Sequence, residues 1–240
     1  MNKKLTALFI ASLGLGAIWP AWASHKQSAY DPCVSKDSIT RQGYTLIFCN
    51  RQPDFDTSTQ RRLIETFFTV YPAEACRFNP HTARKVVFVI DPGYKGVAAT
   101  SGDSTYFNPQ WLKVHPEDID VVTHEVMHIV QAYRYPVPGW LTEGIADYAR
   151  YFYGVNNQAG KWRLPDFRAG QHYTNAYRVT ARFLVWLEKN NHPGIVDSLD
   201  KAARAGTYSP RIWTDLTGKT VDDLWQDYSR DPVISDPLLH

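Results

Sequence analysis

The sequence contains few methionines, few cysteines and no excess of either charge. Its 240 residues include two methionines and three cysteines, and 26 basic residues stand against 24 acidic ones. The absence of a basic run leaves no electrostatic footprint for nucleic acid or for an anionic membrane. There is no Cys-x-x-Cys pair and no Gly-x-Ser-x-Gly elbow, so a thiol redox role and a serine hydrolase of that type have no support.

Long apolar runs are also absent after the first 23 residues, and the run within them indicates export. Two lysines precede an apolar run over residues 5–19, and the small-residue site Ala-Trp-Ala follows at 21–23. This layout is typical of a secretory signal peptide over residues 1–23, because the run is too short to span a bilayer. We therefore expect an exported protein, periplasmic or extracellular, without a membrane or lipid anchor. Its mature chain would carry 24 basic and 24 acidic residues, and we expect a monomer.

The rest of the sequence predicts one α+β domain over residues 43–240, after an irregular segment over residues 24–42. Strand-forming residues concentrate in the first part of this domain, and helical periodicity dominates the second. The order predicts a β-rich lobe over residues 43–115 with a small mixed sheet, and a mainly helical lobe over residues 116–240.

The individual elements follow from local composition and spacing. Pro72 is expected to end the first helix, and Pro116 is expected to begin the second. A capping box is expected at Thr57 and Gln60. Strands are expected at 44–49 and 86–90, and one or two edge strands at 97–100 and 105–108. Helices are expected at 58–71, from 116, at 142–152, 176–188, 194–204 and 220–229.

The three cysteines predict one disulfide and one free thiol in an oxidising compartment. The expected strand at 44–49 and the helix at 58–71 each span about 20 Å at standard rises. The helix end near Cys76 should therefore return close to Cys33. We expect a Cys33–Cys76 disulfide with Cys49 buried and free, and three unpaired cysteines are the alternative.

The expected helix from residue 116 contains His-Glu-Val-Met-His at 124–128, an HExxH motif. Histidines four residues apart lie on one face of a helix, so the ring nitrogens of His124 and His128 can converge on one zinc ion. Glu125 lies beside them and is expected to act as the base on a metal-activated water. The motif also arises by chance, and a solvated helix face with two histidines is the alternative.

A catalytic zinc site needs a third protein ligand and an open position. Gln131 and Arg134 stand where the metzincin pattern needs Gly and His, and no methionine follows Met127, so that class is excluded. The next expected helix offers Glu143 as a carboxylate ligand. One turn later, Asp147 can accept the spare N–H of a ligand histidine. Two solvated surface acids are the alternative, and their apolar neighbours on this helix argue against it.

Three motifs give the sequence a resemblance to a known family. They are His-Glu-Val-Met-His at 124–128, Glu-Gly-Ile-Ala-Asp-Tyr at 143–148 and Tyr-Arg-Val-Thr-Ala-Arg-Phe-Leu at 177–184. In these motifs the chain resembles the basic secretory protein family of plants and bacteria, and the resemblance covers roughly residues 45–230.

The resemblance implies a zincin-like fold and a zinc peptidase of gluzincin type. It implies one catalytic zinc ion held by residues that match His124, His128 and Glu143, with a base that matches Glu125. It also implies that the partner is a peptide or protein substrate.

The transition state of such a reaction needs a hydrogen-bond donor for the developing oxyanion. Tyr177, His172 and Tyr173 are the candidates. We favour Tyr177, because it begins the expected helix at 176–188 and belongs to the third motif, whereas the other two are expected to be packed or surface residues. An extended substrate is expected to pair its backbone with the edge strand within 97–108.

Two other functions fit the same residues. The first is a secreted zinc-binding module without turnover, such as an adhesion or envelope-binding protein. The presence of Glu125 argues against it, because a structural zinc site needs no base. The second is a zinc hydrolase of another amide or ester, such as a cell-wall peptide, and only the substrate distinguishes it from a peptidase.

Overall fold

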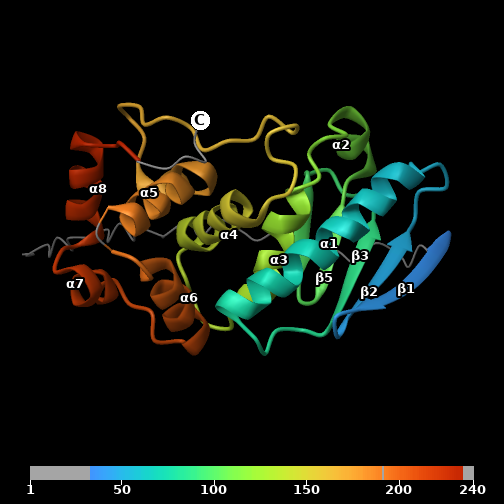
Figure 1. The fold of residues 1–240 in the computed structure, drawn as a ribbon, viewed down its shortest axis with the longest axis horizontal. Helices are drawn as coiled ribbons and strands as arrows, with labels where there is room; N and C mark the ends of the chain where they lie inside the picture. Colours follow the sequence, from blue (N-terminus) through green and yellow to red (C-terminus); the bar gives the residue numbers. More distant parts are fainter. Residues whose placement is uncertain (1–32, 191, 235–240) are drawn as a thin grey trace, which may run out of the picture. The chain divides into compact units, whose positions relative to one another are not determined.

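The computed structural model describes residues 33–190 and 192–234, which belong to one compact unit (Figure 1). The expected signal peptide over residues 1–23 lies outside the described residues and stays a prediction. Among the helices that the structure describes, none combines the length and the apolar character that a membrane crossing requires.

A five-stranded mixed sheet forms the N-terminal part. Its strands are ordered β1-β2-β3-β5-β4, with parallel pairing of β2 to β3 and of β3 to β5. The two outer strands pair antiparallel to their neighbours, so β1 and β4 are the edges of the sheet. The strands are β1 Ser35–Arg41, β2 Tyr44–Asn50, β3 Lys85–Ile90, β4 Ala98–Ser101 and β5 Ser104–Phe107.

The C-terminal part is helical, and one long helix precedes it. The helices are α1 Thr57–Phe78, α2 Pro109–Val114, α3 Val121–Gln131, α4 Gly139–Tyr153, α5 Tyr177–Lys189, α6 Ile195–Ala205, α7 Arg211–Thr217 and α8 Val221–Arg230, with a 3-10 turn at Tyr173–Asn175. The predicted α+β class, with a small mixed sheet followed by a mainly helical part, is confirmed.

One face of the sheet is covered by α1, which crosses it in Figure 1. The ring of Phe67 on α1 meets that of Phe88 on β3 edge-to-face at 5.4 Å, and Phe88 meets Phe107 on β5 at 4.9 Å. All three side chains are fully buried. Such aromatic contacts add directional attraction to the large apolar area that they bury, so they fix α1 across the centre of the sheet.

The predicted irregular segment over residues 24–42 is wrong for its last part, because Ser35–Arg41 forms strand β1. A two-residue turn at Gln42 and Gly43 connects it to β2, and both residues have positive φ, 51° and 77°. Two consecutive left-handed residues are typical of a tight hairpin turn, and glycine adopts this conformation at little cost. The polar edge strand lacked the apolar alternation by which strands are recognised.

Two predicted helix boundaries are also wrong. Helix α1 continues through Pro72 to Phe78, because Tyr71 and Ala75 on either side of the proline are fully buried and their packing outweighs one lost hydrogen bond. Helix α3 begins at Val121 rather than at Pro116.

The caps and two short helices also differ from the prediction. The N-cap of α1 is Asp56, whose carboxylate accepts a hydrogen bond from the Thr59 N–H, so no Thr57 capping box forms. The short helices α2 and α7 were not predicted, because six or seven residues carry too little periodicity to be recognised.

The predicted Cys33–Cys76 disulfide is wrong. Cys33 is bonded to Cys49, with their Cα atoms 5.3 Å apart, and Cys76 is free and exposed on α1. The β1–β2 hairpin explains this pairing, because its register places Ser35 opposite Asn50 and so brings the residues just before β1 to the end of β2. The expectation failed because it did not include strand β1.

Helices α4 and α5 approach each other closely at Gly144. A Cβ atom on Gly144 would lie 2.3 Å from Cγ2 of Thr180 and 2.7 Å from its Cβ. Thr180 is fully buried and its hydroxyl donates to the Tyr173 carbonyl, so it has no room to withdraw. The glycine therefore sets the distance between the two helices at the residue next to Glu143.

The disulfide gives a first prediction. Cys33→Ser should lower the free energy of unfolding by about 3 kcal/mol, because the bond joins residues 16 apart in sequence and so closes a loop in the unfolded chain. Chemical denaturation measures this loss, and a reductant should reproduce it in the wild type. Cys76→Ser is the matched control and should leave the stability unchanged. Equal stability of the two variants would contradict the Cys33–Cys49 pairing.

The close approach of α4 and α5 gives a second prediction. Gly144→Ala should destabilise the fold by about 1–3 kcal/mol through overpacking, and it should weaken the zinc binding expected of the adjacent Glu143 by displacing that residue. Denaturant unfolding and zinc titration measure the two effects. Gly139→Ala, also on α4, is the control, because a Cβ there meets nothing within 4 Å. If both variants had the same stability and zinc affinity, the close approach of Gly144 to Thr180 would not constrain the packing of α4 against α5.

Candidate metal centre

Helix α3 carries the two motif histidines on one face. The Nε2 atoms of His124 and His128 lie 3.2 Å apart, and their rings are nearly perpendicular, with an interplanar angle of 84°. Ten of the eleven residues of α3 are buried, so surrounding side chains hold the helix in place. The spacing of four residues therefore produces the convergence of imidazoles that the sequence predicted.

Helix α4 brings a carboxylate to the same point. Glu143 Oε2 lies 3.2 Å from His124 Nε2 and 3.5 Å from His128 Nε2. Zinc–nitrogen and zinc–oxygen bonds of about 2.0–2.1 Å in a tetrahedron place neighbouring ligand atoms roughly 3.3 Å apart. The donor set and its spacing therefore fit a zinc ion. Elsewhere in the part of the chain that the structure describes, no second group of three such side chains occurs.

The other ring nitrogen of each histidine is held by a neighbouring side chain. Asp147 Oδ1 lies 2.7 Å from His124 Nδ1, as the sequence predicted, and Gln131 Oε1 lies 2.8 Å from His128 Nδ1. An acceptor at Nδ1 keeps the proton there and leaves the lone pair of Nε2 available for a metal. Both Nε2 atoms therefore face the Glu143 carboxylate as potential ligands.

Sequence reasoning missed the role of Gln131. Its carbonyl oxygen holds His128, and its amide nitrogen donates to the carbonyl of Thr142 on α4 at 2.9 Å. The side chain is almost fully buried. The signal was present in the sequence, because an amide three residues after the second histidine lies on the same helix face.

The charges of the site favour a cation. Burial opposes a charge on His124, but the carboxylates of Asp147 and Glu143 outweigh it and raise the pKa of His124 well above its usual value. Burial would raise the pKa of Glu143, but hydrogen bonds and charge from the two histidines bring it far below its usual value. The acids around the two imidazoles provide the negative charge that a divalent ion needs.

Glu125 points toward the edge of the sheet. Its side chain is only 6% exposed, and the hydroxyl of Thr100 on β4 lies 2.8 Å from Oε2. Burial and then the Glu125 charge raise the pKa of Tyr94. Sequence reasoning expected Glu125 beside the histidines but missed Thr100, because a contact between α3 and β4 has no local signature in the sequence.

Tyr177 lies beside His124, one of the candidate metal ligands. Its ring stacks on that of His124 with centroids 6.0 Å apart, and 54% of the residue is exposed. Both Ala176 and Tyr177 have positive φ, 63° and 50°, which turns the chain sharply before α5. Burial and then the charges of Glu143, Asp147 and Glu125 raise the pKa of Tyr177, so its hydroxyl keeps its proton at neutral pH.

The other two oxyanion candidates have their polar atoms engaged in local contacts. His172 Nδ1 lies 2.8 Å from the Thr174 hydroxyl, and this histidine caps the short 3-10 turn. The Tyr173 hydroxyl donates to Asp222 at 2.7 Å, and its ring packs against Trp140 at 4.7 Å. Neither contact involves His124, His128 or Glu143, and the expectation that His172 and Tyr173 are packed or surface residues stays a prediction.

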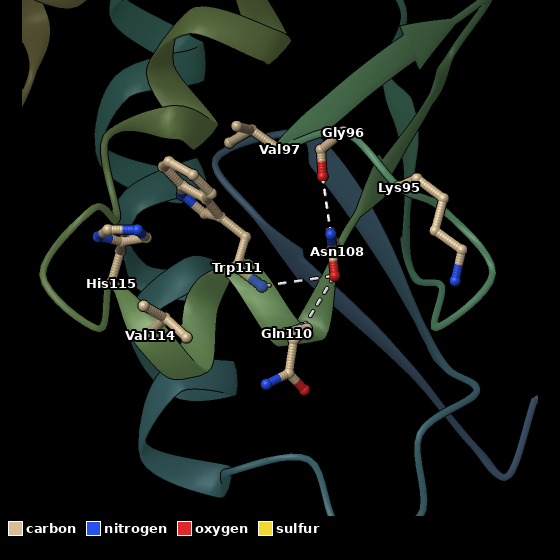
Figure 2. Close-up of a pocket in the computed structure, with 8 residues that line it drawn as sticks. All are labelled: Lys95, Gly96, Val97, Asn108, Gln110, Trp111, Val114 and His115. Atoms are coloured by element: carbon tan, nitrogen blue, oxygen red, sulfur yellow. Dashed lines mark hydrogen bonds between the residues drawn. The ribbon is translucent and has the colours of Figure 1, made fainter.

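A pocket of about 350 Å³ lies where β4 begins (Figure 2). In the view of Figure 2, Asn108 lies between Trp111 and Lys95, and its side chain donates to the Gly96 carbonyl at 2.8 Å. The pocket is lined by Lys95, Gly96, Val97, Asn108, Gln110, Trp111, Val114 and His115. It contains none of the candidate metal ligands and is therefore a separate cavity.

The fold is similar to that of zinc metallopeptidases of known structure. One is a Legionella pneumophila aminopeptidase A in complex with aspartic acid, at 14% identity and a TM-score of 0.57, which covers 80% of this chain and 27% of that one. Another is a variant of a two-domain M1 zinc metallopeptidase bound to L-arginine, at 12% identity and a TM-score of 0.53, which covers 86% of this chain and 54% of that one.

These likenesses show the fold, which is zincin-like. The chain spans about half or less of the length of these proteins. A search of curated proteins gave no match.

The sequence pattern of one family matches most of the described chain. This family is described as peptidase of plants and bacteria, and the match extends over residues 35–228. The match includes all three motifs from which the resemblance was inferred, together with the histidines and the acid that converge between α3 and α4. The protein therefore belongs to this family of plant and bacterial peptidases.

Proposed function

We propose that the protein is an exported, zinc-dependent peptidase of gluzincin type. The observation that carries this proposal is the convergence of His124, His128 and Glu143, whose ligand atoms all lie within 4.8 Å of one another. Membership of a peptidase family and a zincin-like fold support it. Export to the periplasm or the exterior rests on the signal-like segment over residues 1–23.

His124, His128 and Glu143 would hold the ion, and Asp147 and Gln131 would keep the histidines oriented. A zinc ion in such a site supplies a Lewis acid that polarises a peptide carbonyl and promotes deprotonation of water at neutral pH.

Glu125 acts as the base in this proposal. It takes a proton from the attacking water and returns it to the nitrogen of the departing amine. The small exposure of Glu125 limits competing hydration of its carboxylate.

Tyr177 is the donor to the peptide oxygen that gains charge in the transition state. Its phenol lies at the exposed side of the ligand group, stacked on His124, and its raised pKa keeps the proton in place. A neutral phenol that donates a hydrogen bond to a developing oxyanion stabilises the transition state more than the ground state.

Strand β4 offers an edge for an extended substrate. It pairs with β5 on one side and is the last strand of the sheet on the other. An extended peptide can add to such an edge through main-chain hydrogen bonds. The Thr100 contact with Glu125 places this edge beside the proposed base, so a peptide paired with β4 would present its backbone there.

Metal content and the role of Glu125 test the proposed function together. The purified protein should carry about one zinc ion per chain and cleave members of a random peptide library, and a chelator should abolish cleavage.

Glu125→Gln should keep the zinc but lower kcat by about 10²–10⁴-fold, because it removes the base. Glu65→Gln, on the exposed face of α1, is the control. Full activity of Glu125→Gln would contradict the assignment, and cleavage restricted to cell-wall peptides would narrow the substrate class.

Tyr177→Phe tests the proposed oxyanion donor. We expect kcat to fall by about 10²-fold or more with KM and zinc content nearly unchanged, because the lost hydrogen bond forms only in the transition state. Steady-state kinetics on a cleaved library peptide measure the effect. Tyr135→Phe, a similarly exposed tyrosine, is the control. An unchanged kcat would remove Tyr177 from the mechanism.

A further inference from the structure

A row of side chains in register across the sheet leads to Glu125. Phe48 on β2 is paired with Phe88 on β3, Phe88 with Thr105 on β5, and Thr105 with Thr100 on β4. Residues paired in this way lie side by side on the same face of a sheet. This is the face that α1 covers through Phe88, and at its β4 end Thr100 meets Glu125 on α3.

The Thr100 hydroxyl contacts two oxygen atoms of Glu125. It lies 2.8 Å from the carboxylate oxygen Oε2 and 3.0 Å from the backbone carbonyl oxygen of the same residue. A buried carboxylate that accepts a hydrogen bond is restricted in its side-chain torsions, and the loss of the donor leaves it both poorly solvated and free to turn. The contact therefore fixes the direction in which Glu125 points.

A second threonine, Thr105, contacts the Thr100 hydroxyl and can donate to it. Thr105 is fully buried, and its hydroxyl lies 3.0 Å from that of Thr100. A hydroxyl has one proton to donate and two lone pairs to accept. When Thr105 donates to Thr100, the proton of Thr100 is directed to Glu125.

The backbone N–H and C=O of Thr100 lie on the outer edge of β4, the same edge on which the Ala98 carbonyl accepts a hydrogen bond from the Tyr94 hydroxyl at 2.9 Å. The hairpin turn closes at the Ser101–Ser104 pair, and Val97 accepts a hydrogen bond from Asn108 at 3.1 Å. Hydrogen-bonded and non-hydrogen-bonded pairs alternate along an antiparallel ladder. Thr100 therefore occupies a non-hydrogen-bonded pair, and its N–H and C=O are directed away from β5.

We propose that Thr100 is a positioning residue that orients Glu125 and couples this base to the strand edge on which the substrate pairs; this inference rests on the proposed function. One residue then contacts the base through its side chain and the substrate through its backbone. A substrate paired with β4 holds Thr100 in place and thereby holds the carboxylate that acts on it.

The chain contains a natural control for this role. In the β1–β2 hairpin, Thr40 and Thr45 occupy the same cross-strand position next to a two-residue turn, with their hydroxyls 2.9 Å apart. This pair lies at the opposite edge of the sheet from β4. It makes the same threonine contact at a more exposed position and, among the described residues, has no hydrogen bond to a carboxylate, so it controls for the loss of a threonine pair beside a hairpin turn.

The test compares Thr100→Val, Thr100→Ser and Thr40→Val in the zinc-loaded protein, with a peptide selected from the random library as substrate. We expect Thr100→Val to lower kcat by about 10- to 100-fold with KM within about twofold, because the base is misplaced while substrate binding remains. Thr100→Ser should restore most of the loss, since it keeps the hydroxyl. Thr40→Val should match the wild type, and all three variants should keep their zinc and unfold within a few degrees of one another.

Two results would overturn the inference. One is a kcat of Thr100→Val equal to that of Thr40→Val, and the other is a Thr100→Ser variant as slow as Thr100→Val. If the wild type cleaves no library peptide, the proposed function fails, and the positioning role is then decided by crystal structures of the wild type and of Thr100→Val. A Glu125 carboxylate in the same rotamer in both would refute it, and a turned carboxylate would support it.

Discussion

The contact between α3 and α4 determines the position of every group in the candidate metal centre. Asp147 on α4 binds His124 on α3, and Gln131 on α3 reaches the backbone of α4 at Thr142. The first bridge is buried and the second is partly buried, and a buried hydrogen-bonding group left without its partner is costly. The two helices therefore have little freedom to slide, and the same bonds that join them also orient the imidazoles. The hydrogen bonds that stabilise the pairing of α3 and α4 are therefore the same ones that preorganise the site.

Helix α5 and strand β4, which pack around α3 and α4, also help to position the groups of the site. Helix α5 can lie against α4 only because Gly144 has no side chain, and this contact is adjacent to the carboxylate that completes the ligand group. On the other side, strand β4 supplies Thr100 to the buried Glu125. Ligands on rigid, closely packed helices hold their geometry better than ligands on loops. The site thus depends on packing partners that sequence spacing does not reveal.

The parts of the site that could be predicted are those with local spacing. His124, His128 and Glu125 follow from one helical turn, and Glu143 with Asp147 from another, so periodicity alone brought them onto two helix faces. Thr100 and the Cys33–Cys49 bond depend on strand pairing between separate segments, which the sequence does not specify locally. The long helix α1 was cut short in the prediction for a related reason. The rule for proline is local, whereas the burial of Tyr71 and Ala75 that overrides it is a property of the whole fold.

The disulfide lies near one edge of the sheet, and the strand that contacts Glu125 forms the other edge. The Cys33–Cys49 bond ties β1 to β2, while β4, which contacts Glu125, forms the other edge with two strands between it and β2. Successive strands lie about 4.8 Å apart, so the thiol chemistry of one margin is too distant to affect the charge or the shape of the other. Formation of the disulfide and the proposed reaction beside β4 are consequently independent of each other. A molecule folded under reducing conditions would be less stable, yet the contact between Thr100 and Glu125 would be unchanged for as long as the chain stayed folded.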